Sequence, residues 1–266
     1  MTESELLFTH LLNCSRDKLY LNKLTKLSRI EVQFLANTLR RRFQGEPIQY
    51  ILGKIEFMGL EFKLTPDVFI PRPETEILVE TVINLVTPHA SHVTRLNIMD
   101  IGTGSGNIAI SLAKFLPFAK VTATDISEKA LQIAKQNALS NNVEINFLKS
   151  NLFPSPETRD PRYEIIVSNP PYIPTAEIKN LEPELSFEPR IALDGGRDGL
   201  DFYRCIITEA PTYLERHGFL ILEMGFNQCS PIKELFKLSG KFQIIEVVKD
   251  YNNYERVIVA RRRRYG

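Results

Sequence analysis

From about residue 74 to the end of the chain, segments with the spacing of amphipathic helices alternate with short apolar segments. A short apolar segment bounded by turn residues is typical of a strand that is buried on both faces. Such strands belong to parallel sheets, because the connecting helices cover both faces. The alternation therefore predicts an α/β fold with strands at 96–101, 120–124, 144–148, 163–168, 219–223, 242–248 and 256–260. Helices are expected at 74–86, 108–116, from about 127, at 200–217 and at 231–238.

The last two expected strands are separated only by residues 249–255. A parallel crossover needs a dozen or more residues, so these two strands should pair antiparallel. Four arginines occupy positions 261–264, where we expect a solvated chain end. The sequence thus indicates a mostly parallel sheet that is completed by an antiparallel last strand.

Residues 1–54 form a different kind of segment, in which apolar residues recur at helical spacing and glycine and proline occur only near the end. This segment carries a net charge of +4 and the remainder carries −3. Arg40, Arg41 and Arg42 close its last helix. They suit either a solvated last turn that complements the helix dipole or a docking face for an acidic or phosphate-bearing partner. We expect a small helical domain over residues 1–54.

Apolar residues alternate on both sides of Met58-Gly59, which predicts a β-hairpin. Pro66, Pro71 and Pro73 then stiffen the passage into the α/β segment. The chain should therefore consist of a helical domain (1–54), a β-hairpin connector (55–72) and a catalytic domain (73–266).

Composition excludes several classes of protein. The net charge is +1, so the chain lacks the basic field of a typical nucleic-acid binder. No apolar run approaches the ~20 residues that cross a bilayer, and the first residues are acidic where a signal peptide is basic. The three cysteines are widely spaced, which favours buried thiols over disulfides or a zinc site. We expect a cytoplasmic protein with no membrane segment and no metal.

A glycine-rich loop, Asp100-Ile101-Gly102-Thr103-Gly104-Ser105-Gly106, follows the first buried strand and opens a helix. Glycine allows positive φ and lets a ligand approach the main chain, and such a loop lies at the edge of the sheet where ligands bind. Its G-x-G-x-G spacing differs from the G-x-G-x-x-G of dinucleotide sites, which place a pyrophosphate at the helix N-terminus. Asp100 would repel a phosphate but suits an ammonium group.

Asp125 ends the next strand, at a position where an acidic side chain typically binds the hydroxyls of a ribose. A ligand that combines an amino-acid cation with an unphosphorylated ribose is S-adenosylmethionine. The glycine loop and Asp125 together therefore predict this cofactor.

A second constellation, Asn169-Pro170-Pro171-Tyr172, follows the buried strand at 163–168. The prolines hold Asn169 and Pro170 extended. The side-chain oxygen of Asn169 and the main-chain oxygen of Pro170 could then accept two hydrogen bonds from one planar NH₂ group, on which Tyr172 could stack. This arrangement suits an amide or an aromatic amine as the nucleophile, with catalysis by positioning and electrostatics and without a general base.

With these residues the chain resembles the PrmC/HemK family, the peptide chain release factor glutamine N5-methyltransferases. The resemblance covers about residue 45 to the end and includes Phe57-Met58-Gly59-Leu60, Pro71-Arg72-Pro73-Glu74-Thr75-Glu76 and Gly195-Gly196-Arg197-Asp198-Gly199-Leu200. Many methyltransferases share the glycine loop, and DNA adenine and some RNA methyltransferases share Asn-Pro-Pro-Tyr. The combination with Pro-Arg-Pro-Glu-Thr-Glu makes the resemblance specific.

The resemblance implies a Rossmann-like class I S-adenosylmethionine-dependent methyltransferase with a seven-stranded sheet and an N-terminal helical domain that docks the substrate. The substrate would be the glutamine of the Gly-Gly-Gln motif of class 1 release factors, with no direct need for nucleic acid. Asn169, Pro170 and Tyr172 would act in catalysis, and together with Pro171 they would bind the glutamine. The cofactor would contact Asp100, Gly102, Thr103, Gly104, Ser105, Gly106, Asp125, Asn151, Leu152 and Asn169. Asn151 stands where the family usually has aspartate, so it would bind the adenine amino group through its amide oxygen.

Other functions fit the sequence less well. A nucleic-acid amino methyltransferase could flip a base toward residues 169–172, which we call the hook. Such an enzyme usually needs a target-reading region and phosphate contacts. The 54 N-terminal residues are few and only mildly basic for this purpose. A non-catalytic sensor of the cofactor would not need Asn169, and a nicotinamide oxidoreductase is disfavoured by the glycine spacing.

Overall fold

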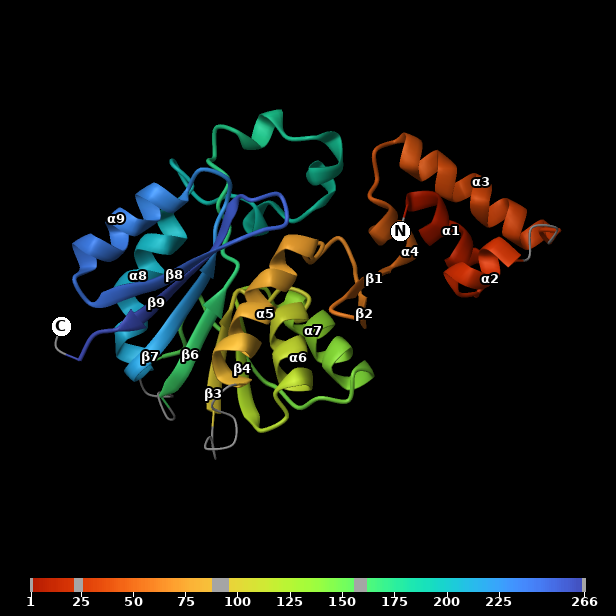
Figure 1. The fold of residues 1–266 in the computed structure, drawn as a ribbon. Coiled ribbons are helices and arrows are strands. Elements are labelled where there is room, and N and C mark those ends of the chain that lie inside the picture. The colour runs from red at the N-terminus through yellow and green to blue at the C-terminus, as the bar shows by residue number, and fades with distance from the viewer. Residues whose placement is uncertain (1, 22–25, 88–95, 156–161, 265–266) are drawn as a thin grey trace.

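The structure is a computed structural model, and it describes residues 2–21, 26–87, 96–155 and 162–264. Its centre is a seven-stranded sheet in the order β5-β4-β3-β6-β7-β9-β8 (Figure 1). The strands β5, β4, β3, β6 and β7 run parallel, and β9 is antiparallel to both β7 and β8. The α/β class and the antiparallel last strand are thus confirmed. The strands are β3 (Leu96–Ile101), β4 (Ala119–Asp125), β5 (Asn146–Lys149), β6 (Tyr163–Ser168), β7 (Leu214–Glu223), β8 (Phe242–Lys249) and β9 (Glu255–Arg262).

Helices cover both faces of this sheet (Figure 1). Successive strand residues point to opposite faces, so Ile98 belongs to one buried cluster and Met99 to the other. Burial on both faces explains why the central strands β3, β6 and β7 are rich in apolar residues. The helices on one face are α5 (Pro73–Val86), α6 (Asn107–Phe115) and α7 (Glu128–Ser140), and those on the other are α8 (Asp201–Tyr213) and α9 (Cys229–Ser239).

The N-terminal helices lie apart from the sheet, at the right of Figure 1. Two of them begin at capping boxes, in which Thr2 pairs with Glu5 and Ser28 with Glu31. These boxes satisfy amide groups that a helix start otherwise leaves unpaired. The helices are α1 (Glu3–Leu11), α2 (Arg16–Leu21), α3 (Arg29–Phe43) and α4 (Ile48–Leu52).

The predicted hairpin consists of β1 (Lys54–Phe57) and β2 (Leu60–Lys63). Met58 and Gly59 have φ of 52° and 71°, the positive values that a tight two-residue hairpin turn requires. The Asn137 side chain of α7 accepts a hydrogen bond from the Lys63 N–H (2.7 Å) and donates one to its carbonyl oxygen (3.1 Å). The hairpin is thereby fastened to the catalytic part of the chain.

Residues 173–199, which we call the roof segment, cross the carboxyl end of the sheet and appear green to teal at the top of Figure 1. The segment contains the short 3-10 helices η3 (Ile178–Asn180), η4 (Pro183–Phe187) and η5 (Arg190–Ala192). Its two ends are held together by a parallel bridge between Ile173 and Asp194. How this segment folds was not predicted from the sequence.

Three expectations were wrong in detail. Helix α8 ends at Tyr213, four residues before the expected end, because Leu214 is fully buried and already pairs with Tyr163 of β6. The arginine run is exposed to solvent at Arg261 and Arg263 as expected, but it is ordered rather than frayed, since Arg261 and Arg262 belong to β9 and Arg263 Nε donates to the Phe242 carbonyl oxygen (2.9 Å). Of the three cysteines only Cys229 is buried; Cys14 is half-buried and Cys205 is exposed.

The arginines at the end of α3 hold the chain together. Arg41 binds the Glu46 carboxylate through two nitrogens, and Arg42 pairs with Glu3 and with Glu184 of the roof segment (2.9 and 2.8 Å). Arg40 remains exposed, and its guanidinium donates a hydrogen bond to the Asn37 side chain (3.2 Å). Arg41 and Arg42 are therefore internal ties, and Arg40 is the member of the run that is open to a partner. No helix in the described ranges is both long and apolar enough to cross a membrane.

Candidate active site

The two sequence motifs meet at one edge of the sheet. The glycine loop follows β3 and the Asn-Pro-Pro-Tyr hook follows β6, and these strands are neighbours with Ile101 and Ser168 in register. The Ser168 hydroxyl donates a hydrogen bond to the Ile101 carbonyl oxygen over 2.7 Å. Both loops therefore leave the sheet side by side, at the edge where open α/β sheets bind ligands.

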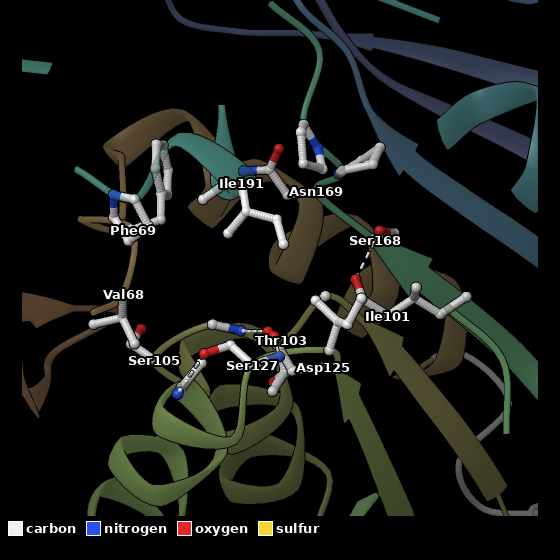
Figure 2. A pocket seen from close by; sticks show the side chains of 18 of the residues that line it. Val68, Phe69, Ile101, Thr103, Ser105, Asp125, Ser127, Ser168, Asn169 and Ile191 are labelled. Carbon is white, nitrogen blue, oxygen red and sulfur yellow. Dashed lines mark hydrogen bonds between the residues drawn. The ribbon is translucent and has the colours of Figure 1, made fainter. Parts of the chain in front are cut away.

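A cavity of about 330 Å³ lies between these loops. Its size falls within the range of pockets that hold small molecules. Figure 2 shows Asn169 and Ile191 on one side of the cavity and Thr103, Ser105, Asp125 and Ser127 on the opposite side. Val68 and Phe69 of the connector form a further wall.

The glycines of the loop differ in what they face. Gly102 and Gly104 have φ of 72° and 56° and line the cavity, and a Cβ on either would meet nothing within 4 Å. Gly106 does not line the cavity; a Cβ there would lie 2.9 Å from Ile110 and 3.1 Å from Ala134. Gly102 and Gly104 thus expose main chain to a ligand, whereas Gly106 is required by the close packing of α6 on α7.

Asp125 lines the cavity at the end of β4. Its carboxylate accepts hydrogen bonds from the Gly104 and Ser127 N–H groups, both over 2.8 Å. Burial raises the pKa of Asp125, and these N–H groups oppose the shift by stabilising the charged form. An ionised carboxylate has about four acceptor positions, so it can still bind ribose hydroxyls.

Asp100 lies beneath the loop and is not among the residues that line the cavity. The Thr103 hydroxyl donates to its Oδ2 over 2.6 Å, and its Oδ1 has no hydrogen-bond partner in the described part of the chain. Burial raises the pKa of Asp100 to about 7. The expected direct contact with an ammonium group is therefore not available, and Thr103 is the member of this pair that faces the cavity.

Asn151 and Leu152 line the cavity beyond β5. Leu152 has φ of 65°, and its carbonyl oxygen accepts a hydrogen bond from the Thr124 hydroxyl (2.7 Å). Asn151 is exposed, so its amide is free to bind a ligand at this end of the cavity.

Asn169 and Pro170 line the cavity opposite the glycine loop. Asn169 Nδ2 donates a hydrogen bond to Thr75 Oγ1 over 3.1 Å. Among the described residues, neither Asn169 Oδ1 nor the Pro170 carbonyl oxygen accepts a hydrogen bond. The two acceptors that the sequence predicted are thus unused by the protein itself.

Tyr172 is half-buried, and its ring packs partly into the core beneath the hook. Burial raises the pKa of its hydroxyl to about 12. Its main-chain oxygen accepts a hydrogen bond from the Gln228 side chain over 2.9 Å. A Cβ on Gly195 or Gly199 would overlap the main chain of Pro171 or Tyr172. These glycines and Gln228 fix the hook, and sequence reasoning missed this role although the Gly-Gly-Arg-Asp-Gly run was its signal.

The remaining walls were also missed. Phe69 and Arg72 come from the connector, and Leu185 and Ile191 come from the roof segment. The Arg72 guanidinium lies 4.8 Å from the Phe69 ring centre and forms an ion pair with the buried carboxylate of Glu188. Glu188 Oε2 also accepts a hydrogen bond from the Ile70 N–H (3.0 Å), so the roof segment is tied to the connector.

The lining of the cavity offers groups that suit the parts of S-adenosylmethionine. Open main chain at Gly102 and Gly104, the Asp125 carboxylate and the exposed Asn151 amide suit a methionine moiety, a ribose and an adenine in that order. No group of metal-binding side chains occurs in the described ranges.

Comparisons with known proteins agree with this geometry. Residues 1–53 match the family model of the PrmC N-terminal domain, and residues 73–183 match that of the Methyltransferase small domain. The release factor glutamine methyltransferase of Geobacter sulfurreducens is 42% identical over 260 residues, which are 97% of this chain and 88% of the relative. The chain belongs to the release factor glutamine methyltransferase family. The Coxiella burnetii member of that family is 40% identical over 261 residues, 98% of this chain and 91% of the relative.

The fold of this family member is also similar to more distant solved structures. A methyltransferase from Pyrococcus furiosus superposes with a TM-score of 0.58 at 20% identity, covering 86% of this chain and 99% of the other. This similarity supports the class I methyltransferase fold.

Proposed function

We propose that this protein transfers a methyl group from S-adenosylmethionine to the side-chain amide nitrogen of the glutamine in the Gly-Gly-Gln motif of class 1 release factors. One observation carries the proposal: Asn169 Oδ1 and the Pro170 carbonyl oxygen are open acceptors on the cavity that the glycine loop and Asp125 also line. Membership of the release factor glutamine methyltransferase family supports the choice of acceptor.

S-Adenosylmethionine, when bound, supplies an electrophilic methyl group on a sulfonium sulfur, which would keep the electrons of the broken S–C bond as the thioether of the product S-adenosylhomocysteine. Gly102 and Gly104 provide the main-chain surface for its methionine moiety, Asp125 accepts hydrogen bonds from its ribose, and Asn151 and Leu152 contact its adenine. The Asp100 carboxylate adds negative charge from beneath the loop and fixes Thr103.

An amide nitrogen is a weak nucleophile because its lone pair is delocalised. Asn169 Oδ1 and the Pro170 carbonyl oxygen would hold both of its hydrogens, which orients the nitrogen toward the donor and favours the pyramidal form that attacks. The nitrogen becomes much more acidic as the new bond forms, so the proton can leave without a strong base. In agreement, no histidine or lysine is found among the cavity-lining residues that the structure describes.

The N-terminal helices would dock the body of the release factor. Arg40 is exposed near the end of α3, and Leu39 and Phe43 of the same turn region are exposed apolar residues. An exposed apolar surface with a charged rim is typical of protein interaction sites. Since Arg42 contacts Glu184, this docking surface is tied to the roof of the cavity.

The proposal is tested by incubating a purified class 1 release factor with the protein and methyl-labelled S-adenosylmethionine, followed by peptide mass spectrometry. We expect one added methyl group on the side chain of the Gly-Gly-Gln glutamine. Labelling of another residue, or of adenine in added RNA or DNA but not of the release factor, would overturn the proposal.

A further inference from the structure

A buried carboxylate lies behind the Asn169 amide. Asn169 Nδ2 donates to Thr75 Oγ1, and Thr75 is 1% exposed near the start of α5. The Glu223 carboxylate in turn lies close enough to the Thr75 hydroxyl for that hydroxyl to lower the pKa of Glu223 against the effect of burial. Glu223 ends β7, the strand next to β6, so α5, β6 and β7 each contribute one member of this chain of side chains.

The donor and acceptor properties of these three side chains determine which way each hydrogen bond between them runs. An ionised carboxylate can only accept, so the single proton of the Thr75 hydroxyl is directed to Glu223. The Thr75 oxygen is then left as an acceptor, which selects the NH₂ end of the Asn169 amide. Asn169 Oδ1 is consequently directed away from Thr75, as an acceptor for the substrate. A reversed amide would place NH₂ against the NH₂ of the substrate.

Glu223 is held at some cost to stability. It is 1% exposed, and its Oε2 has no hydrogen-bond partner in the described part of the chain. Burial raises the pKa of Glu223 to about 7. A buried carboxylate without full hydrogen bonding is unfavourable for folding and is typical of functional sites.

We propose that Glu223 and Thr75 are positioning residues, which fix the Asn169 amide with its oxygen toward the nitrogen that accepts the methyl group. This inference rests on the proposed function, because it assigns Asn169 Oδ1 to the acceptor amide. Neither residue needs to touch the substrate for this role.

A dependence on pH follows. A protonated Glu223 can donate to Thr75, which frees the Thr75 hydroxyl to donate to Asn169 and removes the preference for one amide orientation. Turnover at saturating substrate should therefore decrease as the pH falls below about 7. The charged groups that act on Glu223 are Arg256 of β9 and Arg72, which favour its ionised form, and Glu74, which opposes it; Tyr172 and Tyr203 are also close enough to interact with it.

The experiment compares kcat, the KM for release factor and the Kd for S-adenosylmethionine in four variants of the full chain. In Thr75→Val, which keeps the shape but removes the hydroxyl, kcat should fall about 10- to 100-fold with an unchanged cofactor Kd. Thr75→Ser should restore kcat to within about threefold, since it restores the hydroxyl. Thr81→Val is the matched control in the same helix and should behave as wild type, because the Thr81 hydroxyl donates to the Ile77 carbonyl oxygen of its own helix (2.7 Å).

In Glu223→Gln the decrease of kcat at acidic pH should disappear, because glutamine does not titrate. Equal kcat in Thr75→Val and wild type would overturn the inference, and so would an acid limb that survives in Glu223→Gln. If circular dichroism shows that Glu223→Gln does not fold, the kcat values of Thr75→Val and Thr75→Ser still test the inference. If wild type itself places no methyl on glutamine, the proposed function fails instead, so the two failures can be told apart.

Discussion

Ser168 and Ile101 are joined at the ends of two neighbouring parallel strands, where the Ser168 hydroxyl donates to the Ile101 carbonyl oxygen over 2.7 Å. The next residue after Ser168 is Asn169 of the hook, and the next after Ile101 is Gly102 of the glycine loop. One buried hydrogen bond thus fixes the relative position of the two loops. The proposed methyl transfer requires this proximity, because one loop would hold the methyl donor and the other the acceptor amide.

Gly199→Ala should disturb the hook through a steric overlap, in addition to the cost of placing alanine at positive φ. Gly199 and Gly53 have similar φ, 74° and 71°, so alanine at either position costs about 1–2 kcal/mol from the backbone. A Cβ at Gly199 would also overlap the Tyr172 carbonyl oxygen, whereas one at Gly53 would meet nothing within 4 Å. We expect Gly199→Ala to lower both the free energy of unfolding and kcat, and Gly53→Ala to lower only the former. Denaturant unfolding and a transfer assay measure the two; equal kcat in both variants would show that crowding at Tyr172 is unimportant.

Asp125→Ala should raise the Kd for S-adenosylmethionine about tenfold or more, because hydrogen bonds to a carboxylate are among the strong ones. Asp125→Asn should have a smaller effect, since it keeps one acceptor oxygen for Gly104 or for the ribose. Glu128→Ala is the control, because Glu128 is an exposed carboxylate of the same region that only pairs loosely with Lys149 (3.7 Å). Isothermal titration calorimetry gives each Kd, and an unchanged value in Asp125→Ala would remove Asp125 from the cofactor site.

Asp100→Asn should change how stability depends on pH. Burial raises the pKa of Asp100 from 3.8 to about 7, so between these values the folded protein binds more protons than the unfolded chain. Linkage then requires that this residue makes the wild type progressively less stable as the pH rises from about 4 to about 7, with no further change above. Relative to wild type, Asp100→Asn should therefore gain stability over that interval. Unfolding in urea at a series of pH values checks this, and a difference independent of pH would contradict it.

Arg40→Glu should weaken the release factor as a substrate while leaving a short Gly-Gly-Gln peptide unaffected. Arg40 is exposed, whereas Arg41 and Arg42 are held by Glu46, Glu3 and Glu184, so reversing all three would also disturb the fold. We expect KM for the protein substrate to rise about three- to tenfold, as is usual for a charge at the rim of an interface. Lys120→Glu is the control, because Lys120 is an exposed charge near the start of β4, at the end of the sheet away from the cavity. A similar loss on the peptide would rule out docking through Arg40.

Local sequence signals predicted much of the fold. The central strands are largely buried on both faces and are therefore rich in apolar residues, so their positions could be read closely; β6 falls on the predicted residues 163–168. The glycine loop and the hook were predicted because the chemistry resides in contiguous residues. Where the end of an element depends on tertiary pairing, prediction failed, as for α8, which Leu214 ends by joining the sheet.

The contacts that complete the site connect residues distant in the sequence. Thr75 lies 94 positions from Asn169, and Arg42 lies 142 positions from Glu184. No local pattern specifies such pairs. The same reason explains why contact with the cofactor was predicted for Asp100 and Gly106. Tertiary packing instead places Asp100 beneath the loop and Gly106 between two helices.

The proposed role of Asn169 is to hold the amide that receives the methyl group, and measuring methyl transfer and cofactor affinity side by side in Asn169→Ala is its sharpest test. Transfer to the release factor should fall at least about 100-fold, because both the hydrogen bond and the alignment are lost. The Kd for S-adenosylmethionine should stay within about twofold of wild type, since the cofactor is held mainly from the opposite side of the cavity. Near-normal transfer by Asn169→Ala would contradict the account.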